Sequence, residues 1–416
     1  MSAGDGGAAG PRAAALSLLL VAACLACGDE RAVEEPAVGA APCEEGATGA
    51  VPPWAPIELR YAHNFAVEER ESGRLVRVRN PWRGAETELR YLLAACGSAS
   101  LAVPESAQFV EVPVERLVTT STTQVSHLVA LGVTDRLVGH HELFRVASPE
   151  VRRRIEAGLV REVGGGSQVD LETLVELRPD VVLAFSSGSP DFDLPSRLGG
   201  TGIPGVVFAA YMEETPLARA EWIKFTSLFV AKEAEAKAIF DDVAERYRAL
   251  ARLGAQEKRR PTVLVGAPFR GVWHVSGGRS YIARLVADAG ARYLWADDES
   301  RGGVPLDMES VYARARDADV WLHPWGFASL EEALQKEPRF AAFRAVREGR
   351  VYANDARALP GGGNDYFETG SLRPDLVLED LLAILHPGLV PEHELVFYRR
   401  LESPAATAAG ETVPAR

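Results

Sequence analysis

Two glutamates, Glu172 and Glu309, occupy equivalent places in two segments that read as copies of each other. Residues 169–183 and 306–322 each carry Asp-apolar-Glu, a short amphipathic stretch, an aspartate and an apolar run. The aspartate before each glutamate is a natural N-cap, and the glutamate falls in the positive first turn of a helix. Such local electrostatics explains either glutamate alone. The repetition at a distance of 137 positions predicts two similar lobes, each presenting one ionised carboxylate suited to pairing with a guanidinium group.

The histidines are scattered and show no spacing typical of a metal site. They stand at His127, His140, His141, His274 and His323, among others. Direct capture of zinc or manganese is therefore the alternative hypothesis rather than the main one. An enzyme is a further alternative, but the sequence contains no nucleophile elbow, phosphate loop or HExxH motif. The pattern favours a protein without catalytic activity and without a resident metal or other cofactor.

The charge of the chain restricts its partners. With 45 basic and 58 acidic residues the formal net charge is −13. No basic stripe is available to neutralise phosphates, which argues against nucleic acid. An anionic membrane surface is also a poor docking partner for this chain.

The N-terminus predicts export. Arg12 precedes an apolar run over residues 13–23, a length typical of a signal-peptide core and too short to span a bilayer. Residues 21–24 resemble a lipobox, in which Cys24 receives the lipid, and Cys27 ends a second, poorer match. We therefore expect a lipid-anchored protein of the cell envelope, in the periplasm. An ordinary secretory signal with an incidental cysteine is the alternative.

Two further cysteines, Cys43 and Cys96, lie beyond the signal region. In an oxidising compartment an even number of cysteines is consistent with a disulfide, and two buried thiols are the alternative. Lipidation at Cys27 leaves only Cys43 and Cys96, which can pair with each other. Lipidation at Cys24 leaves Cys27 as a third cysteine without a partner of its own. The lipobox favours Cys24, and the cysteine count favours Cys27.

The organisation of the chain follows from its changes in pattern. An Ala/Gly/Pro-rich tether precedes alternating runs typical of a small antiparallel β cap, and two series of alternating strands and helices predict α/β lobes with parallel sheets. The expected parts are a signal peptide (1–23), a tether (24–56), the cap (57–112), an N-lobe (113–214), a linker helix (215–253), a C-lobe (254–401) and a disordered tail (402–416).

The linker is expected to be one long helix. Thr215 and Pro216 provide an N-cap and a first-turn proline, and apolar residues from Trp222 to Leu250 keep roughly a 3.6-residue period. At 1.5 Å per residue such a helix spans about 50 Å, which suits a rigid strut between two lobes.

Several motifs, taken together in their order along the chain, make it resemble the substrate-binding lipoproteins of ABC importers for vitamin B12 and ferric siderophores. The resemblance covers roughly residues 114–401 and extends to the cap, because a subset of these proteins carries similar segments there. The segments are Tyr61–Phe65, Asn80–Trp82, Ala220–Phe225, Gly277–Tyr281, Tyr293–Asp297 and Gly362–Tyr366. The resemblance implies two Rossmann-like lobes joined by a rigid helix, the class III periplasmic binding protein fold, and a solute carried in the cleft between them.

The resemblance also implies partners for the two repeated glutamates. In this family one glutamate on each lobe docks onto arginines of the membrane permease, and by position these are Glu172 and Glu309. The solute is expected to be a ferric siderophore, haem or cobalamin.

The ligand contacts implied by the family lie in loops at the strand ends. They are Thr122, Thr123, His140, His141, Phe185, Phe269, Trp273, Asp365 and Tyr366. For Phe185 and Phe269, the alternative to ligand contact is packing in the core. For the adjacent His140 and His141, the alternative is a place in a solvated loop. Near the repeats, where B12 binders often place a tryptophan, this chain has glycine-rich segments at 164–167 and 302–305, which leaves siderophore and haem open beside cobalamin.

Overall fold

The computed structural model describes residues 54–402 except 72, 96–102, 104–105, 167 and 190–192. All of the described residues belong to one compact unit. The predictions for the signal peptide, Cys24, Cys27, Cys43, Cys96 and the tail beyond residue 402 lie outside the described residues. Among the residues that are described, no helix is long and apolar enough to cross a membrane.

The N-lobe is built on a five-stranded sheet in the order β11-β10-β5-β6-β7, with every neighbouring pair parallel. The strands are β5 (Leu117–Thr119), β6 (Leu137–His140), β7 (Arg161–Glu162), β10 (Val181–Ala184) and β11 (Gly205–Val207), with a hairpin of β8 (Gly164–Gly165) and β9 (Gln168–Val169). The helices are α1 (Thr122–Ala130), α2 (Pro149–Glu156), α3 (Leu171–Leu177) and α4 (Leu194–Arg197), with 3₁₀ turns η1 (Thr134–Arg136), η2 (Leu143–Arg145) and η3 (Ala210–Met212). The central strands β5 and β10 are wholly buried, as expected for a sheet covered on both faces.

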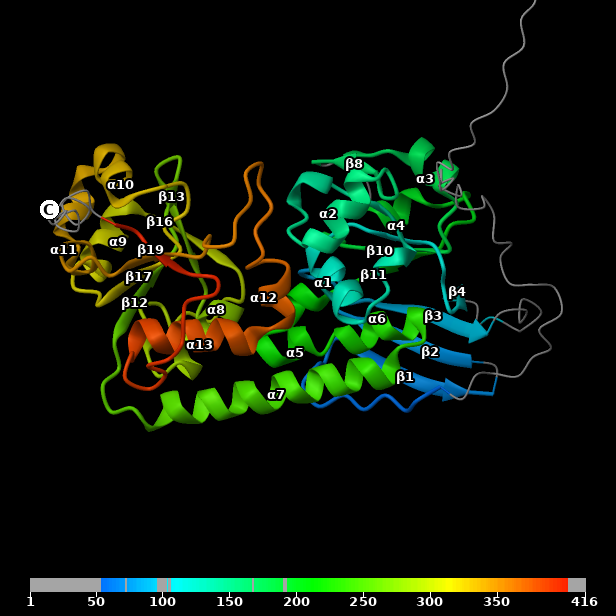
Figure 1. Cartoon of the computed structure of the whole chain (residues 1–416), viewed down its shortest axis with the longest axis horizontal. Helices are drawn as coiled ribbons and strands as arrows, with labels where there is room; N and C mark the ends of the chain where they lie inside the picture. The colour runs from blue at the N-terminus through cyan, green and yellow to red at the C-terminus, as the bar shows by residue number, and fades with distance from the viewer. Residues whose placement is uncertain are drawn as a thin grey trace, which may run out of the picture. The chain divides into compact units, whose positions relative to one another are not determined.

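The C-lobe repeats this plan with a sheet in the order β15-β12-β17-β18-β19, in which only the last pair is antiparallel. Its strands are β12 (Thr262–Val265), β15 (Arg292–Tyr293), β17 (Val320–Leu322), β18 (Val351–Ala353) and β19 (Arg399–Arg400), and a second sheet joins β13 (Pro268–Phe269), β14 (Val272–Ser276) and β16 (Gly303–Asp307). Its helices are α8 (Tyr281–Asp288), α9 (Met308–Ala315), α10 (Leu330–Lys336), α11 (Arg344–Arg347), α12 (Thr369–Leu372) and α13 (Pro374–Leu385), with η4 (Pro338–Ala342). The prediction of two α/β lobes is confirmed (Figure 1).

The linker differs from its prediction. Three helices replace the single one: α5 (Pro216–Ala220), α6 (Ile223–Val230) and α7 (Glu233–Gln256). The break between the last two is at Ala231, which adopts a left-handed conformation with φ 53°. All eight residues of α6 are buried, whereas α7 is amphipathic, and the two helices pack against each other. The long rigid helix is confirmed as α7, but it begins at Glu233 rather than near Thr215, because apolar periodicity does not show that the chain turns back on itself between two apolar segments.

The rigid connection is α7 alone. Its 24 residues span about 36 Å. At one end Glu233 Oε1 accepts a hydrogen bond of 2.7 Å from Arg74 in the cap, and near the other Tyr247 donates one of 2.7 Å to Asp288 of the C-lobe. The helix also packs along α13, so it belongs to the C-lobe as well as to the linker.

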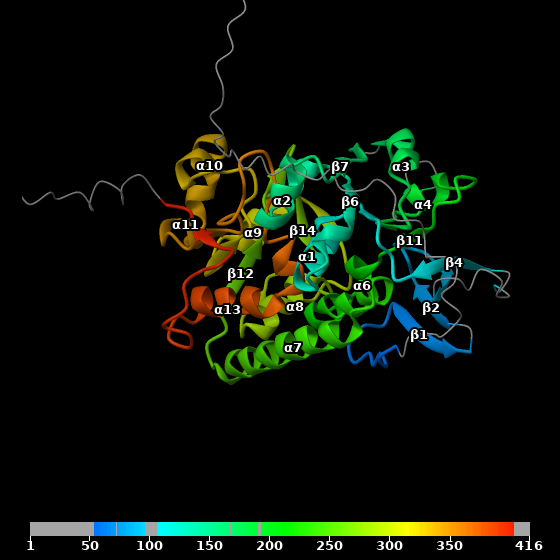
Figure 2. The ribbon, with the colours of Figure 1, turned by 45° about the vertical axis from the view of Figure 1, so that its right-hand side comes forward.

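The cap is a four-stranded sheet of β1 (Phe65–Arg70), β2 (Gly73–Arg79), β3 (Glu88–Ala95) and β4 (Ala107–Val112). The first three strands are antiparallel as predicted, and β4 adds to β3 in parallel. Figures 1 and 2 both place these strands beside α6 and the start of α7. Edge-on aromatic contacts join them there: the ring centroid of Phe65 lies 4.9 Å from that of Trp222 and 5.4 Å from that of Phe225.

Residues 57–61, at the start of the predicted cap, form no strand. Backbone N–H groups of this segment instead donate hydrogen bonds to Glu221, whose side chain is completely buried. Its carboxylate accepts hydrogen bonds from the backbone N–H groups of Arg60 (3.0 Å), Tyr61 (2.7 Å) and Ala62 (2.8 Å), and from Lys224 Nζ (2.7 Å). Glu213 does the same for His63 and Asn64, so two buried carboxylates replace a β ladder.

We expect Glu221→Ala to lower the free energy of unfolding by about 3–5 kcal/mol, because it leaves the buried ammonium of Lys224 and three backbone donors without their acceptor. Urea unfolding followed by circular dichroism measures this. The matched control is Glu235→Ala, which removes an exposed i,i+3 pair with Lys232 on α7 and should cost less than about 0.5 kcal/mol. Equal effects of the two substitutions would contradict the structural role given to Glu221.

Candidate functional site

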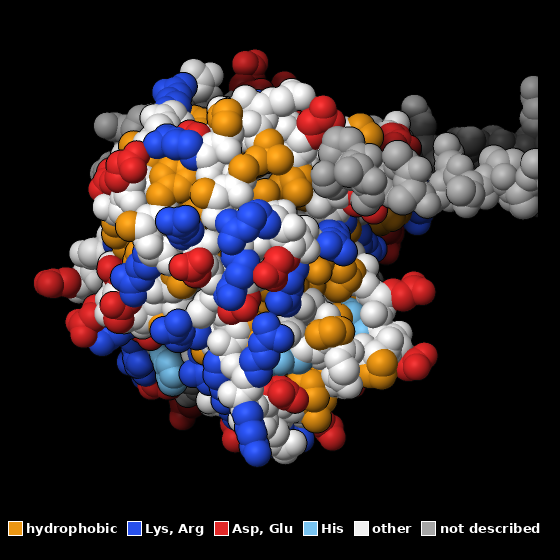
Figure 3. Space-filling model, turned by 90° about the vertical axis from the view of Figure 1, so that its left-hand side faces the viewer, with side chains coloured by type: hydrophobic (Ala, Val, Ile, Leu, Met, Phe, Trp, Pro, Cys, Tyr) orange, Lys and Arg blue, Asp and Glu red, His pale blue; other side chains and the backbone are white. Residues whose placement is uncertain are grey.

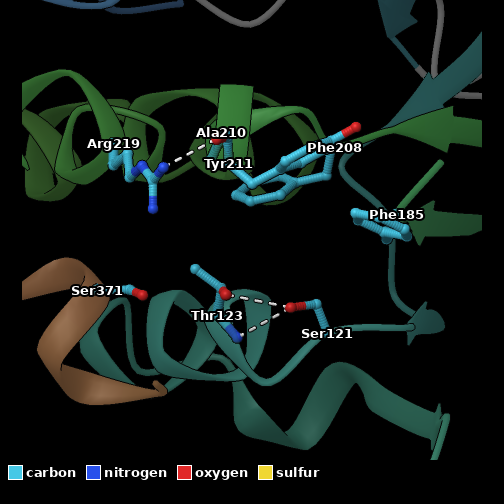
Figure 4. A pocket seen from close by; sticks show the side chains of 8 residues that line it. All are labelled: Ser121, Thr123, Phe185, Phe208, Ala210, Tyr211, Arg219 and Ser371. Carbon is cyan, nitrogen blue, oxygen red and sulfur yellow. Dashed lines mark hydrogen bonds between the residues drawn. The ribbon is translucent and has the colours of Figure 1, made fainter. Parts of the chain in front are cut away.

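The candidate site is a pocket where the N-lobe meets α12 of the C-lobe (Figure 4). Its cavity volume is about 70 Å³, well below the roughly 300–1,000 Å³ of sites for drug-sized ligands. It is lined by Ser121, Thr123, Phe185, Phe208, Ala210, Tyr211, Arg219 and Ser371. Figure 4 shows Arg219 and the aromatic side chains across the space from Thr123 and Ser121, with Ser371 completing the polar side.

The polar side begins at the N-terminus of α1. Ser121 caps this helix, and Gln124 closes a capping box by accepting from the backbone N–H of Ser121 at 3.2 Å. The helix is therefore fixed at the carboxyl end of β5, where parallel sheets present their ligands. This places Thr123 at the pocket, with its hydroxyl 3.1 Å from that of Ser121 (Figure 4).

The aromatic side is held by the loop that follows β10. Phe185 is 47% exposed, and its ring centroid lies 4.9 Å from that of Tyr211. Asp193 organises the loop by accepting hydrogen bonds from Ser186, Ser187 and Gly188. Burial opposes ionisation of Asp193, but these hydrogen bonds keep its pKa below the ordinary value. The carboxylate thus acts as the fixed centre of the loop.

Arg219 supplies the charge. Its Nε donates to the backbone carbonyl of Glu213 (3.1 Å), its Nη2 to that of Tyr211 (2.9 Å), and its guanidinium stacks 4.5 Å from the ring centroid of Tyr281. Burial lowers the pKa of Arg219, yet a guanidinium remains charged in proteins. No described carboxylate forms an ion pair with it. The remaining N–H groups of this cation are available to a ligand.

The structure brings two of the predicted ligand residues, Thr123 and Phe185, into this pocket. Thr122 and His141 are half-buried nearby in the chain, and Phe269 is 64% exposed on β13. These three do not line the described pocket, and their role stays a prediction.

The other four predicted ligand residues are buried. His140 shares a 2.7 Å hydrogen bond with Thr119, and burial lowers its pKa to about 3, so it is neutral. Trp273 is fully buried against Trp321 and donates to the carbonyl of Val265. It belongs to the core of the C-lobe and offers no surface to a ligand.

Asp365 and Tyr366 are also buried. Asp365 pairs with Arg357 at 3.1 Å and accepts from the backbone N–H of Thr369, so it caps the approach to α12. Tyr366 packs edge-on against His323 and Tyr398. These contacts give Asp365 and Tyr366 a structural role. They hold in place the segment that leads into α12, the helix that carries Ser371.

Sequence reasoning missed Phe208, Ala210, Tyr211, Arg219, Ser121 and Ser371. The first three follow β11, so the rule that ligands gather at the carboxyl ends of parallel strands points to them. Arg219 lies on α5 and Ser371 on α12, and neither stands at a strand end. Only the tertiary packing of α12 against α1 and α5 brings these side chains to the pocket.

The repeated aspartates are N-caps as expected. Asp170 Oδ1 accepts from the backbone N–H of Thr173 at 3.0 Å, and Asp307 Oδ1 from that of Ser310 at 2.8 Å. Glu172 and Glu309 therefore lie in the first turns of α3 and α9, both exposed. Glu309 pairs with Arg339 at 2.8 Å, and its side chain is still 80% exposed.

A family model described as periplasmic binding protein matches residues 117–358, more than half of the chain. The chain belongs to the periplasmic binding protein family. Its structure resembles that of a periplasmic haem-binding protein from Pseudomonas aeruginosa, with a TM-score of 0.53 and 21% identity over 70% of this chain and 99% of the other. It also resembles the apo form of the periplasmic haem-binding protein RhuT from Roseiflexus, with a TM-score of 0.51 and 20% identity over 66% of this chain and 99% of the other. An uncharacterised lipoprotein of Methanocaldococcus jannaschii is 26% identical over 84% of this chain and 87% of its own length.

Beside the pocket of this periplasmic binding protein, a buried carboxylate joins the two lobes. Glu368, at the start of α12, accepts from the backbone N–H groups of Ala147 (2.7 Å) and Ser148 (2.9 Å) in the N-lobe. Burial raises the pKa of Glu368 to about 7, against the effect of both hydrogen bonds, and the nearby charge of Asp365 adds to the rise. The contact between lobes is therefore sensitive to pH near neutrality.

A raised pKa means that the folded protein binds this proton more tightly than the unfolded chain. The contribution of Glu368 to the free energy of unfolding should therefore grow as pH falls from about 8 towards 5, on the order of 2 kcal/mol. The comparison is the pH dependence of urea unfolding for the natural protein and for Glu368→Gln, which cannot titrate. Parallel pH profiles for the two proteins would rule out this assignment.

Proposed function

We propose that this chain is the solute-binding component of an ABC importer and carries an iron complex, either a ferric siderophore or haem, or else cobalamin. The observation that supports it is the pocket at the meeting of the lobes, where an exposed aromatic face stands opposite hydroxyls and beside the unpaired guanidinium of Arg219. Aromatic faces bury flat ligand surface, and a guanidinium selects an anionic oxygen. Haem and many siderophores carry such oxygens, whereas the side chains of cobalamin are largely neutral amides. The site thus favours an iron complex.

Capture is proposed to proceed by opening and closing of the lobes without chemistry. Because α12 packs against α1 and α5, its withdrawal would widen the pocket, and its return would enclose the solute. Direct capture of zinc or manganese gains no support, since three of the histidines are each hydrogen-bonded to a separate hydroxyl group. The pairs are His127 with Thr226, His140 with Thr119 and His323 with Tyr398.

Export and a lipid anchor belong to the same proposal. The related Methanocaldococcus jannaschii protein is described as a lipoprotein, which supports lipidation at Cys24, with Cys27 as the alternative. The lipid would hold the protein at the envelope membrane beside its permease. A disulfide between Cys43 and Cys96 remains a prediction.

The first test is a titration of the purified protein with haemin, ferric siderophores and cobalamin, followed by tryptophan fluorescence. We expect saturable quenching by an iron complex, weakened about tenfold by Phe185→Ala because an aromatic contact of roughly 1.5–3 kcal/mol is lost. Val175→Ala, an exposed apolar residue of α3 outside the pocket, is the matched control. No response to any of these solutes would overturn the proposed function.

Docking to the permease is proposed for Glu172 and Glu309. Their distribution suits this role, with one exposed carboxylate at a helix N-terminus on each lobe. Figure 3 shows acidic and basic side chains interspersed over the side of the molecule that carries α10 and α11. The acidic excess of the chain forms no single negative surface there, so docking would depend on individual carboxylates.

The double variant Glu172→Ala/Glu309→Ala should abolish uptake of the solute by cells and leave the dissociation constant of the purified protein unchanged. Glu176→Ala/Glu331→Ala, which removes two exposed carboxylates from α3 and α10, should keep near-normal uptake. Weaker solute binding in the first variant would contradict the docking assignment.

A further inference from the structure

A loop of the C-lobe between β18 and α12 keeps its own shape. Its ends are joined by an isolated β-bridge between Ala358 and Asn364, and within it the backbone N–H of Leu359 donates to the carbonyl of Gly363 at 2.7 Å. We call residues 358–368, from this bridge to the start of α12, the strap. Because these bonds are internal, the strap can keep its shape when its outer contacts are broken.

The strap rests on residues 144–148 of the N-lobe. A Cβ atom at Gly362 would lie 3.2 Å from Cδ2 of Phe144, so this ring packs directly against the glycine backbone. A Cβ atom at Gly363 would lie 3.0 Å from the carbonyl oxygen of Arg145. The two glycines thus permit a close approach between the backbones of the two lobes.

Glu368 binds the last part of the strap to the same stretch of the N-lobe. Its carboxylate accepts from the backbone N–H groups of Ala147 at 2.7 Å and Ser148 at 2.9 Å. Ser371 lies three residues further along the chain, in α12, and lines the pocket. The position of the strap on the N-lobe therefore sets the position of α12 at the pocket.

The contacts of the strap can be exchanged for water at little net cost. Phe144 is 48% exposed even with the strap in place, and the other contacts are polar. The pocket that α12 helps to enclose has a volume of only about 70 Å³. A haem, ferric siderophore or cobalamin needs a site of at least several hundred Å³, so α12 must move before the pocket can admit such a solute.

We propose that the strap is a latch, which holds α12 against the N-lobe in the closed protein and releases when a solute enters or leaves the pocket. This inference rests on the proposed function and adds to it the element that controls solute exchange. Phe144 and Gly363 make the contact between the lobes, and neither lines the pocket, so both act on the rate of exchange without touching the solute. The latch also gives a role to the Gly362–Tyr366 motif, whose aspartate and tyrosine are buried.

The first test wedges the strap away from the N-lobe. Gly363 is not in a left-handed conformation, so Gly363→Leu adds bulk against the N-lobe carbonyls without straining the backbone. Hydrogen–deuterium exchange of the peptide that contains Ala147 and Ser148 should become about tenfold faster, because both amides lose their acceptor. The matched control is Gly388→Leu, an exposed glycine at which a Cβ would meet no atom within 4 Å, and it should leave this exchange unchanged.

The second test measures solute release. Phe144→Ala removes the ring that rests on Gly362 and leaves the backbone as it is. In stopped-flow tryptophan fluorescence with haemin, ferrichrome and cobalamin as probes, Phe144→Ala and Gly363→Leu should each release a bound solute about tenfold faster. Leu159→Ala, which truncates a 44% exposed leucine of the N-lobe, is the control and should change the rate less than about twofold.

The outcomes separate the latch from the proposed function. Unchanged amide exchange in both strap variants would overturn the latch, and Phe144→Ala decides the question if Gly363→Leu does not fold. Faster exchange with unchanged release would also overturn it, because the strap would then be a static contact, while the proposed function would stand. Binding of none of the three solutes would overturn the proposed function together with the role of the latch in solute exchange.

Discussion

The buried carboxylate of Glu221 is the contact on which the arrangement of the cap depends. It gathers three consecutive backbone N–H groups of residues 60–62 and the ammonium of Lys224, all within hydrogen-bonding distance. A charge without solvent is costly unless every lone pair is satisfied, and here the donors come from both the cap segment and the linker. Neither segment can be satisfied without the other. This explains why the Tyr61–Phe65 and Ala220–Phe225 motifs occur in one chain: they form a single structural unit.

From this anchor the cap acquires its position relative to the pocket. Glu213 fixes the next two residues, His63 and Asn64, and Asn64 in turn holds the end of β2, from which the loop of residues 80–87 departs. The same linker region carries Arg219 on α5. The carboxylates that hold the cap and the guanidinium that faces the pocket thus belong to one short stretch, residues 213–221. A displacement of the cap would therefore disturb the site.

The sequence was sufficient to predict the two lobes, but it predicted only some of the residues of the site. Strand runs such as 117–119 and 181–184 are short, apolar and wholly buried, and capping aspartates mark the repeated helices, so local signals determine both lobes. Thr123 and Phe185 were found because they follow strands. Asp365 and Trp273 also lie near strand ends or motifs, yet packing turns them inward, and a linear pattern carries no sign of that direction. The reversal at Ala231 was missed for the same reason.

Several contacts between the lobes are polar, and this has a mechanical consequence. Glu368 binds the backbone of residues 147–148, and Arg301 pairs with Glu214. Polar contacts can be exchanged for water at little net cost, whereas separating an apolar interface of similar extent is expensive. Apolar packing of α6 and α7 ties the linker to the cap and to the C-lobe. The fold thus combines a permanent connection along α7 with polar contacts between the lobes that water can replace, and such a division suits repeated loading and release of a solute.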